Sequence, residues 1–269
     1  MVRDVWVQQL QKTAPKVHCL TNPVSMQDVA NILLAAGGSA IMGEDTAEVQ
    51  EITSFCQATY LNTGVPNEDK ICACVLAASK AAELGHPVVL DPVGAGATLY
   101  RAKLMELVLK RITPSLIRCN EEEACALLAI ERGGSGGVES DVALQDEIRL
   151  KLAEMLAERY KCTALVSGAS DAVSDRGRAV LLSGGDVRIR RITGGGCMLS
   201  ALCALFCGAG LMPYEAACAA GSIWKESARI AGQRTDRTQG GIGSFHVHLF
   251  DALDQLCHGI RLEESNENK

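Results

Sequence analysis

Residues 87–111 read PVVLDPVGAGATLYRAKLMELVLKR and show the unit that repeats through the chain. Pro87–Asp91 is a short apolar run of the kind found in strands that are covered on both faces. The glycines of the following turn end the strand, and Leu99–Arg111 has the composition of a helix. A strand that leads through a turn into a helix predicts right-handed crossovers and a parallel sheet.

The same alternation continues on both sides of this unit. Further strands are predicted at Val17–Leu20, Ser39–Met42, Thr59–Asn62, Ser115–Arg118, Thr163–Ser167, Ala172–Ser174 and Arg178–Leu182. Further helices are predicted at Met26–Ala36, Ile71–Leu84, Asn120–Ala129, Val142–Arg159, Met198–Phe206, Tyr214–Ala231 and Ser244–Cys257. The last two strands flank the turn Asp175-Arg176-Gly177, so they form a late antiparallel hairpin. We expect a three-layer α/β fold with a mainly parallel central sheet and helices on both faces.

Length and composition limit the class of protein. The chain has 269 residues, of which 48% are hydrophobic, so it can bury a large core. We expect one domain over residues 1–262 and a polar tail over 263–269, with Gly133–Gly137 as a surface loop of that domain. The net charge of −6 argues against general binding to nucleic acid or to an anionic membrane. Twelve scattered cysteines without CxxC spacing favour free thiols and the cytoplasm.

Three consecutive glycines carry the strongest functional signal. In residues 192–197, which read ITGGGC, a β-rich segment ends and an apolar helix begins. Glycines let backbone N–H groups approach a ligand closely, and a helix N-terminus adds unpaired donors and a partial positive charge. No Gly-Lys-Ser/Thr follows, so this is not a Walker A loop. A plain turn before a buried helix is the alternative, but three glycines favour an anion site for a phosphoryl group.

Polar residues also follow three of the predicted strands. Asp91 ends the strand quoted first, Asn22 follows Val17–Leu20, and a stretch from Arg118 to Glu123 follows a third strand. Ligands of open α/β sheets bind at the carboxyl ends of the strands. Arg118 can pair with phosphate, and a carboxylate such as that of Glu123 can hold magnesium through water. Each stretch alone also reads as an ordinary turn or as a helix cap.

Four long stretches resemble a known family: CLTNPVSMQDVANILLAAGGSAIM, VVLDPVGAGAT, LIRCNEEE and TGGGCMLSAL. They are similar to the corresponding segments of hydroxyethylthiazole kinase, which has a ribokinase-like fold and serves thiamine biosynthesis and salvage. The resemblance implies ATP-dependent phosphorylation of the primary alcohol of 4-methyl-5-(2-hydroxyethyl)thiazole to its monophosphate. It also implies Mg²⁺ as cofactor and a homotrimer with sites at subunit interfaces.

The same resemblance assigns roles to single residues. For the thiazole alcohol it implies Met42, Asn22, Gly194, Val65 and Pro66, the last two reaching a neighbour's substrate. For ATP it implies Arg118, Ser167, Thr193 and Asn120. Ser167 stands where the family usually has threonine. For magnesium it implies Asp91 and Glu123. For catalysis it implies Cys197 and the loop of Gly194, Gly195 and Gly196, in which Gly195 replaces the usual alanine or threonine and is expected to loosen the loop.

By the same resemblance, the family carries cysteine, here Cys197, where related sugar and vitamin kinases of the fold carry aspartate. A helix N-terminus lowers the pKa of a thiol below its free value of about 8.5, so a thiolate could accept the alcohol proton. Phosphoryl transfer depends mostly on positioning and charge neutralisation, so we interpret Cys197 first as a positioned group. The alternatives are a kinase for a pyrimidine or pyridoxal alcohol, an ATP-dependent lyase that repairs hydrated nicotinamide cofactors, and a catalytically weakened binding protein.

Overall fold

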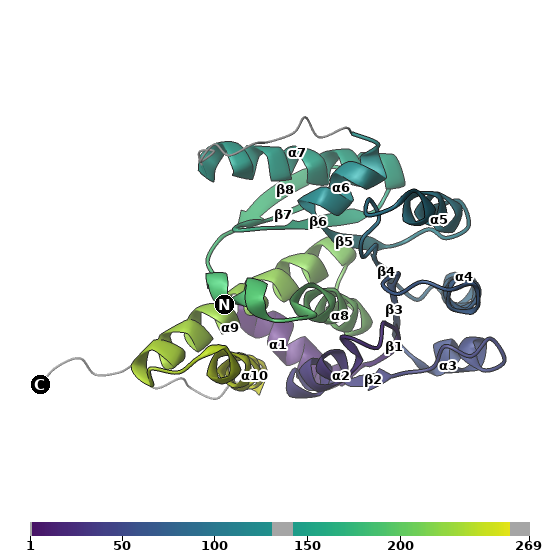
Figure 1. Cartoon of the computed structure of the whole chain (residues 1–269). Helices are drawn as coiled ribbons and strands as arrows, with labels where there is room; N and C mark the ends of the chain where they lie inside the picture. The colour runs from purple at the N-terminus through teal and green to yellow at the C-terminus, as the bar shows by residue number, and fades with distance from the viewer. Residues whose placement is uncertain (1, 131–141, 259–269) are drawn as a thin grey trace, which may run out of the picture.

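One eight-stranded sheet lies at the centre of the molecule (Figure 1). The computed structural model describes residues 2–130 and 142–258. The strands are β1 (Lys16–Leu20), β2 (Ser39–Ile41), β3 (Ala58–Asn62), β4 (Val88–Asp91), β5 (Leu116–Asn120), β6 (Thr163–Ser167), β7 (Asp171–Asp175) and β8 (Arg178–Leu182). They follow the order β2-β1-β3-β4-β5-β6-β7-β8. The first six are parallel and β7 and β8 are antiparallel, so the predicted parallel sheet and late hairpin are confirmed.

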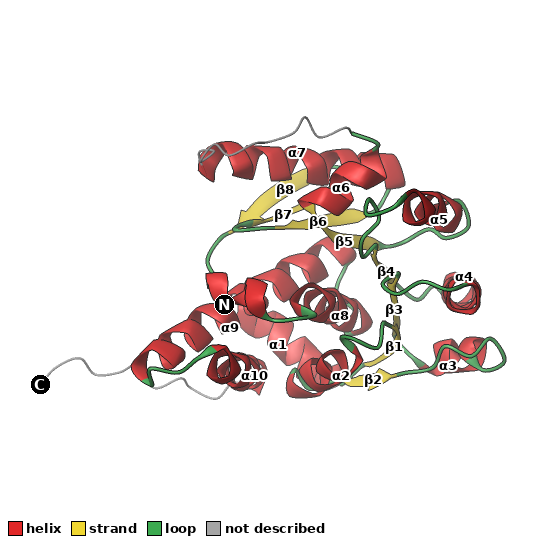
Figure 2. Cartoon of the chain, in the orientation of Figure 1, coloured by secondary structure: helices red, strands yellow, loops and turns green. Residues whose placement is uncertain are grey.

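Helices cover both faces of the sheet (Figure 2). They are α1 (Val2–Thr13), α2 (Met26–Ala35), α3 (Val49–Phe55), α4 (Glu68–Leu84), α5 (Leu99–Leu109), α6 (Glu121–Leu128), α7 (Val142–Tyr160), the 3₁₀-helix η1 (Val187–Arg191), α8 (Gly195–Gly208), α9 (Pro213–Arg237) and α10 (Ile242–His258). One face carries α1, α2, α8, α9 and α10, and the other carries α3 to α7. The expected Gly133–Gly137 loop and the tail at 263–269 lie outside the described residues.

The two faces explain why the strands read as continuous apolar runs. In β6, Leu165 packs into the core beneath α8 and α9, whereas Ala164 and Val166 pack into the core beneath α7. Successive side chains of a strand point to opposite faces, so both faces need apolar residues when both are covered.

Helix ends agree with the local signals. The side chain of Asn120 accepts the Glu123 N–H at 2.8 Å, and a Glu123 oxygen accepts the Asn120 N–H at 2.9 Å, which is the predicted capping box. Gly85 ends α4 in the left-handed region with φ of 69°.

One local prediction is wrong. The segment before the three glycines was expected to be β-rich, but Val187–Arg191 forms the 3₁₀-helix η1. The side chain of Asp186 accepts the Arg188 N–H at 2.9 Å and starts the turn, and Arg188 also pairs with Asp236 at 2.7 Å. The second contact spans 48 residues, so it leaves no trace in the local pattern.

The strand order has a switch point between β1 and β3. The chain runs from β1 outward to β2 and then returns across β1 to β3, so connections leave β1 and β3 in opposite directions. Ligands of open α/β sheets bind outside the carboxyl ends of the strands at such a switch point. Asn22 after β1 and Asn62 at the end of β3 lie at this switch point, where both are buried.

Candidate functional site

A cavity of about 880 Å³ opens at the carboxyl ends of β4, β5 and β6. The N-terminus of α8, the first turn of α6, and residues of η1 and α9 complete its wall. Most of the residues singled out from the sequence line it together: Asp91, Arg118, Asn120, Glu123, Ser167, Gly194, Gly195, Gly196 and Cys197. Segments that lie more than 100 residues apart in the chain thus share one site.

The glycine loop brings the start of α8 close to its neighbours. Gly194 is the N-cap of α8 with φ of 77°, and a Cβ there would lie 2.9 Å from the Ser25 side chain. A Cβ on Gly196 would lie 2.3 Å from Nη1 of Arg118. The first N–H groups of a helix have no partner within the helix, so this end of α8 offers donors and positive potential to an anion.

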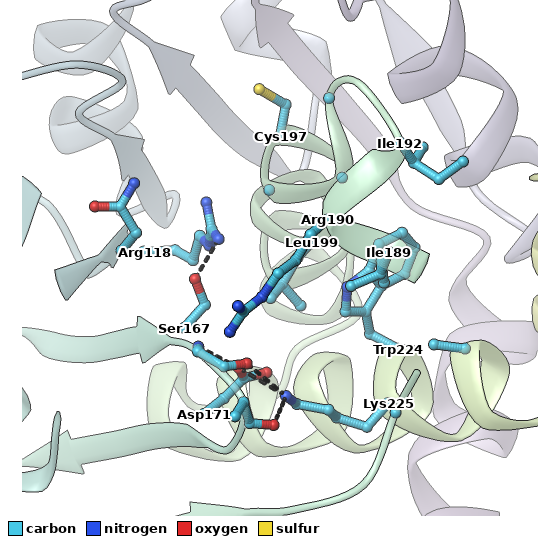
Figure 3. Close-up of a pocket in the computed structure, with 18 of the residues that line it drawn as sticks. Arg118, Ser167, Asp171, Ile189, Arg190, Ile192, Cys197, Leu199, Trp224 and Lys225 are labelled. Atoms are coloured by element: carbon cyan, nitrogen blue, oxygen red, sulfur yellow. Dashed lines mark hydrogen bonds and ion pairs between the residues drawn. The ribbon is translucent and has the colours of Figure 1, made fainter. Parts of the chain in front are cut away.

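Arg118 and Ser167 point toward one another from β5 and β6 (Figure 3). The Arg118 Nη2 donates to the Ser167 Oγ, and that hydroxyl donates in turn to the Cys119 carbonyl at 3.3 Å. Arg118 is 9% exposed, and its Nε has no hydrogen-bond partner in the part of the chain that the structure describes. The guanidinium is fixed on one side and keeps a donor for a ligand.

Asp91 is fully buried at the end of β4, as its position after the strand predicted. Its Oδ2 accepts from the Tyr60 hydroxyl and from Asn62 Nδ2, both at 3.0 Å. Its Oδ1 has no partner within hydrogen-bond distance among the described residues and lies 4.0 Å from Nη1 of Arg118, with Ser200 also near the carboxylate. Burial raises the pKa of Asp91 to about 6, and the nearby Arg118 acts in the opposite direction.

The two carboxylates fit a magnesium ion that is held mainly by a substrate phosphate. Asp91 Oδ1 has free lone pairs, whereas Glu123 already accepts the N–H groups of Asn120 and Gly94, the latter at 2.8 Å. Across residues 2–130 and 142–258 there is no cluster of three or more His, Cys, Asp or Glu side chains that would form a complete cage. Magnesium in nucleotide sites is commonly bound by one or two carboxylates with phosphates and water, so this donor set is sufficient.

Cys197 lies at the start of α8 and is 8% exposed. Its Sγ accepts from Asn62 Nδ2 at 3.2 Å and from Asn22 Nδ2 at 3.9 Å. Burial raises the pKa of the Cys197 thiol, and the charge of Asp91 raises it further. The lowered pKa expected from the helix N-terminus is therefore corrected: burial and the charge of Asp91 raise the pKa of Cys197, which disfavours the thiolate.

Sequence reasoning missed Asn62, which connects the predicted residues. Its Nδ2 contacts Cys197 and Asp91, and its Oδ1 accepts from Asn22 at 3.0 Å. Asn62 pairs in register with Asp91 on the neighbouring strand, and both are 0% exposed. A polar residue at the end of an apolar strand was the signal that identified Asp91, and the same signal was present at Asn62.

Lys225 was missed as well. It projects from α9, where its Nζ donates to the carbonyls of Gly168 at 3.0 Å and Ala169 at 2.7 Å and pairs with Asp171 at 3.1 Å (Figure 3). The lysine fixes the β6–β7 turn that forms one wall of the cavity. The predicted helix also carries Glu215, Glu226 and Arg229, so no local signal set Lys225 apart.

The remaining predicted residues lie outside the cavity. Met42 directly follows β2 and packs against the core, and Asn22 follows β1 and reaches the cavity wall through Asn62 and Cys197. Thr193 is exposed beside the glycine loop. Val65 is 51% exposed with φ of 50°. Pro66 is partly exposed and lies with it in the loop between β3 and α4.

A family model described as "Hydroxyethylthiazole kinase family" matches residues 7–259. The chain belongs to the hydroxyethylthiazole kinase family. It is 36% identical over 249 residues to the hydroxyethylthiazole kinase of Lysinibacillus sphaericus, covering 93% of this chain and 95% of that protein. The resemblance seen in the four sequence stretches is thereby confirmed.

Solved structures agree with the fold of the hydroxyethylthiazole kinase family. The hydroxyethylthiazole kinase protein of Pyrococcus horikoshii has a TM-score of 0.83 at 32% identity, covering 94% of this chain and 92% of that chain. A ribokinase-like superfamily protein of Enterococcus faecalis has a TM-score of 0.61 at 9% identity over 94% of each chain, which shows the shared fold alone. In the part of the chain that the structure describes, no helix is long and apolar enough to cross a membrane.

Proposed function

We propose that this chain transfers the terminal phosphoryl group of ATP to the primary alcohol of 4-methyl-5-(2-hydroxyethyl)thiazole, in thiamine biosynthesis or salvage. One observation carries the proposal beyond family membership. The N-terminus of α8, the Arg118 guanidinium and the unpaired Asp91 oxygen converge on one cavity. Donors, a cation and a carboxylate in that arrangement suit a phosphoryl group whose charge must be neutralised during transfer.

The two substrates occupy opposite ends of the proposed site. ATP places its phosphates at the glycine loop and Arg118, with Ser167 and Asn120 of the cavity wall on its side. Thr193, exposed beside the loop, is assigned to ATP as well. The alcohol lies near the carboxyl ends of β1 and β3, where Asn22, Asn62 and Cys197 form a hydrogen-bonded group. Holding the hydroxyl and the phosphoryl group in line reduces the entropic cost of their encounter.

Magnesium accompanies ATP in this proposal, with Asp91 and Glu123 as its protein ligands, directly or through water. When bound, the ion would neutralise charge on the phosphates. Asp91 supplies Oδ1, which has no partner within hydrogen-bond distance among the described residues, while Glu123 also holds the Gly94 and Asn120 amides in place. Asp91→Asn is expected to lower turnover and change the magnesium requirement.

Cys197 acts in this proposal as a neutral positioning group for the alcohol. Its raised pKa disfavours the thiolate, and its sulfur is held by Asn62. In a loose transition state for phosphoryl transfer, the alcohol oxygen does not have to lose its proton early. In this proposal the proton therefore leaves late and goes to the phosphate.

Three further assignments belong to the same proposal. The chain functions as one kinase domain over residues 1–262 and assembles as a homotrimer in which Val65 and Pro66 reach the neighbour's acceptor beside Met42. Val65 is exposed and has a positive φ, which is strained for a β-branched residue. Such strain is expected in a segment that contacts a neighbouring subunit. Twelve free cysteines support a reducing compartment such as the cytoplasm.

ADP release from the purified chain with magnesium and ATP tests the reaction. The acceptors are the thiazole alcohol, hydroxymethylpyrimidine, pyridoxal and none. Turnover with the thiazole alcohol alone is the expected result. Turnover with the pyrimidine or pyridoxal alone would replace the proposed acceptor, and ATP binding without turnover of any of them would contradict the kinase assignment and favour the repair lyase or a binding protein.

A further inference from the structure

Three cationic side chains line the cavity: Arg118, Lys225 and Arg190. The first two have protein partners, since Arg118 bonds to Ser167, and Lys225 bonds to Asp171 and two carbonyls. Arg190 has no hydrogen bond or ion pair to any residue within 2–130 and 142–258, and its side chain is exposed. A guanidinium held out of packing at the wall of a cavity is available to a ligand.

The turn of η1 directs Arg190 into the cavity. A 3₁₀-helix has three residues per turn, so Val187 and Arg190 share one face, and both line the cavity. Arg188 lies on another face, where Asp186 and Asp236 pair with it at 2.7 Å. Figure 3 shows the Arg190 side chain extending from η1 across the cavity toward the Ser167 wall. Arg188 therefore fixes the turn through its two ion pairs, and Arg190 extends from the turn into the cavity.

We infer that Arg190 binds the polyphosphate chain of the nucleoside triphosphate, opposite Arg118. This inference rests on the proposed function, which places the phosphates between η1, β5 and the start of α8. The cavity also contains the acidic residues Asp91, Asp171, Asp186 and Glu121 to Glu123. A polyanion entering it therefore needs more positive charge than Arg118 and the helix end supply. The planar guanidinium can donate two parallel hydrogen bonds to phosphate oxygens.

The position of Arg190 favours the phosphates over the acceptor. Arg190 precedes the N-cap Gly194 by four residues and extends toward the wall made by Ser167, which Arg118 also contacts. The acceptor is proposed to lie instead beside the hydrogen-bonded group of Asn22, Asn62 and Cys197. We therefore expect loss of Arg190 to weaken nucleotide binding, more strongly for nucleotides with more phosphates. Binding of the acceptor alcohol should not change.

Calorimetric titration of the full chain with magnesium-ATP, magnesium-ADP and adenosine tests the inference without any acceptor. Arg190→Met is expected to weaken ATP binding by roughly 10- to 100-fold, since one charge-assisted hydrogen-bond pair is lost, and to leave adenosine binding unchanged. Arg190→Lys keeps the charge but loses the planar guanidinium that donates two parallel hydrogen bonds. Its affinity for ATP should therefore lie between those of the parent protein and Arg190→Met. Arg191→Met is the matched control, because Arg191 is exposed on η1 and does not line the cavity.

Two outcomes would overturn the inference: an Arg190→Met protein that binds ATP as tightly as the parent, or one that loses ATP and adenosine affinity equally. Thermal unfolding of each variant controls for folding. Failure of the proposed function is distinguishable, because a chain that binds ATP through Arg190 and does not phosphorylate the thiazole alcohol would contradict the acceptor and leave the role of Arg190 intact.

Discussion

The Asn62 carboxamide lies 3.2 Å from the Cys197 sulfur and 3.0 Å from the buried carboxylate of Asp91. It therefore joins the end of β3 to the end of β4 and to the first turn of α8. One side chain holds both the sulfur proposed to position the alcohol and the carboxylate proposed to face magnesium.

Replacing Asn62 with alanine should damage both stability and turnover. It removes the donor to Asp91 and Cys197 and the acceptor of the Gly64 N–H at 2.8 Å, and it leaves Asn22 with only the Cys197 sulfur as acceptor. Each buried polar group left unpaired costs about 1–3 kcal/mol, so the free energy of unfolding should fall by at least that amount. Denaturant unfolding and kcat with the thiazole alcohol are the measurements, and a variant with unchanged kcat would show that the network is not needed for transfer.

Removing the thiol of Cys197 should have a modest effect. A general base contributes about 10²–10⁴-fold, but burial raises the pKa of Cys197 and keeps it protonated. Cys197→Ser should therefore lose less than that range and keep the pH dependence of kcat. Cys197→Asp should keep or raise activity, as other kinases of the fold carry aspartate there. A near-total loss in Cys197→Ser with intact substrate binding would restore the base assignment.

Gly195 and Gly196 should respond oppositely to alanine. A Cβ on Gly195 meets its nearest neighbour at 3.5 Å, an ordinary contact, whereas a Cβ on Gly196 meets Arg118 at 2.3 Å. Gly195→Ala should stabilise the first turn of α8 by about 0.5–1 kcal/mol with turnover retained or raised. Gly196→Ala should displace Arg118 and lower kcat by a factor on the order of 10²–10³, as for loss of an oxyanion donor. Equal kinetics in the two variants would argue against contact between the loop and Arg118.

Lys70 should prove to be a positioning residue for the acceptor end. It is 3% exposed, and its Nζ donates to the carbonyls of Thr21 at 2.7 Å and Gly64 at 3.0 Å, beside Asn22 and Asn62. Lys70→Met should raise KM for the alcohol and lower kcat while ATP affinity stays constant. Lys80→Met is the matched control on α4, because Lys80 pairs with Glu83 at the surface. Equal loss of ATP affinity would indicate general unfolding of the site.

His18 should make the fold sensitive to mild acid. Its Nε2 donates to the Gly43 carbonyl at 2.7 Å, and burial lowers the pKa of His18 below its ordinary value of 6.5. The unfolded chain then binds a proton that the folded chain does not, so the free energy of unfolding should fall as pH drops below 6.5. His18→Gln should flatten that slope in denaturant titrations between pH 7 and pH 5. An identical slope in both proteins would assign the acid sensitivity to other groups.

Local patterns were sufficient for most of the secondary structure. Predicted β6 and β8 have the observed bounds, and the capping box of Asn120 and Glu123 formed as its spacing indicated. Residues 187–192, VRIRRI, alternate as in a strand, yet η1 forms there. We attribute this to the ion pair of Arg188 with Asp236, which lies 48 residues away in the sequence. The short helix α3 and the N-terminal α1 were not predicted at all.

The sequence by itself determined the strand and helix order, the glycine loop, and the strand-end positions of Asp91, Asn22 and Arg118, because these depend on neighbours within a few residues. Only the tertiary structure decided that Asn62 holds Cys197 across 135 residues and that Arg190 faces the cavity while Arg188 does not. It also reversed the expected pKa shift of Cys197. Burial and long-range contacts arise from the order in which strands pack, and no local pattern encodes them.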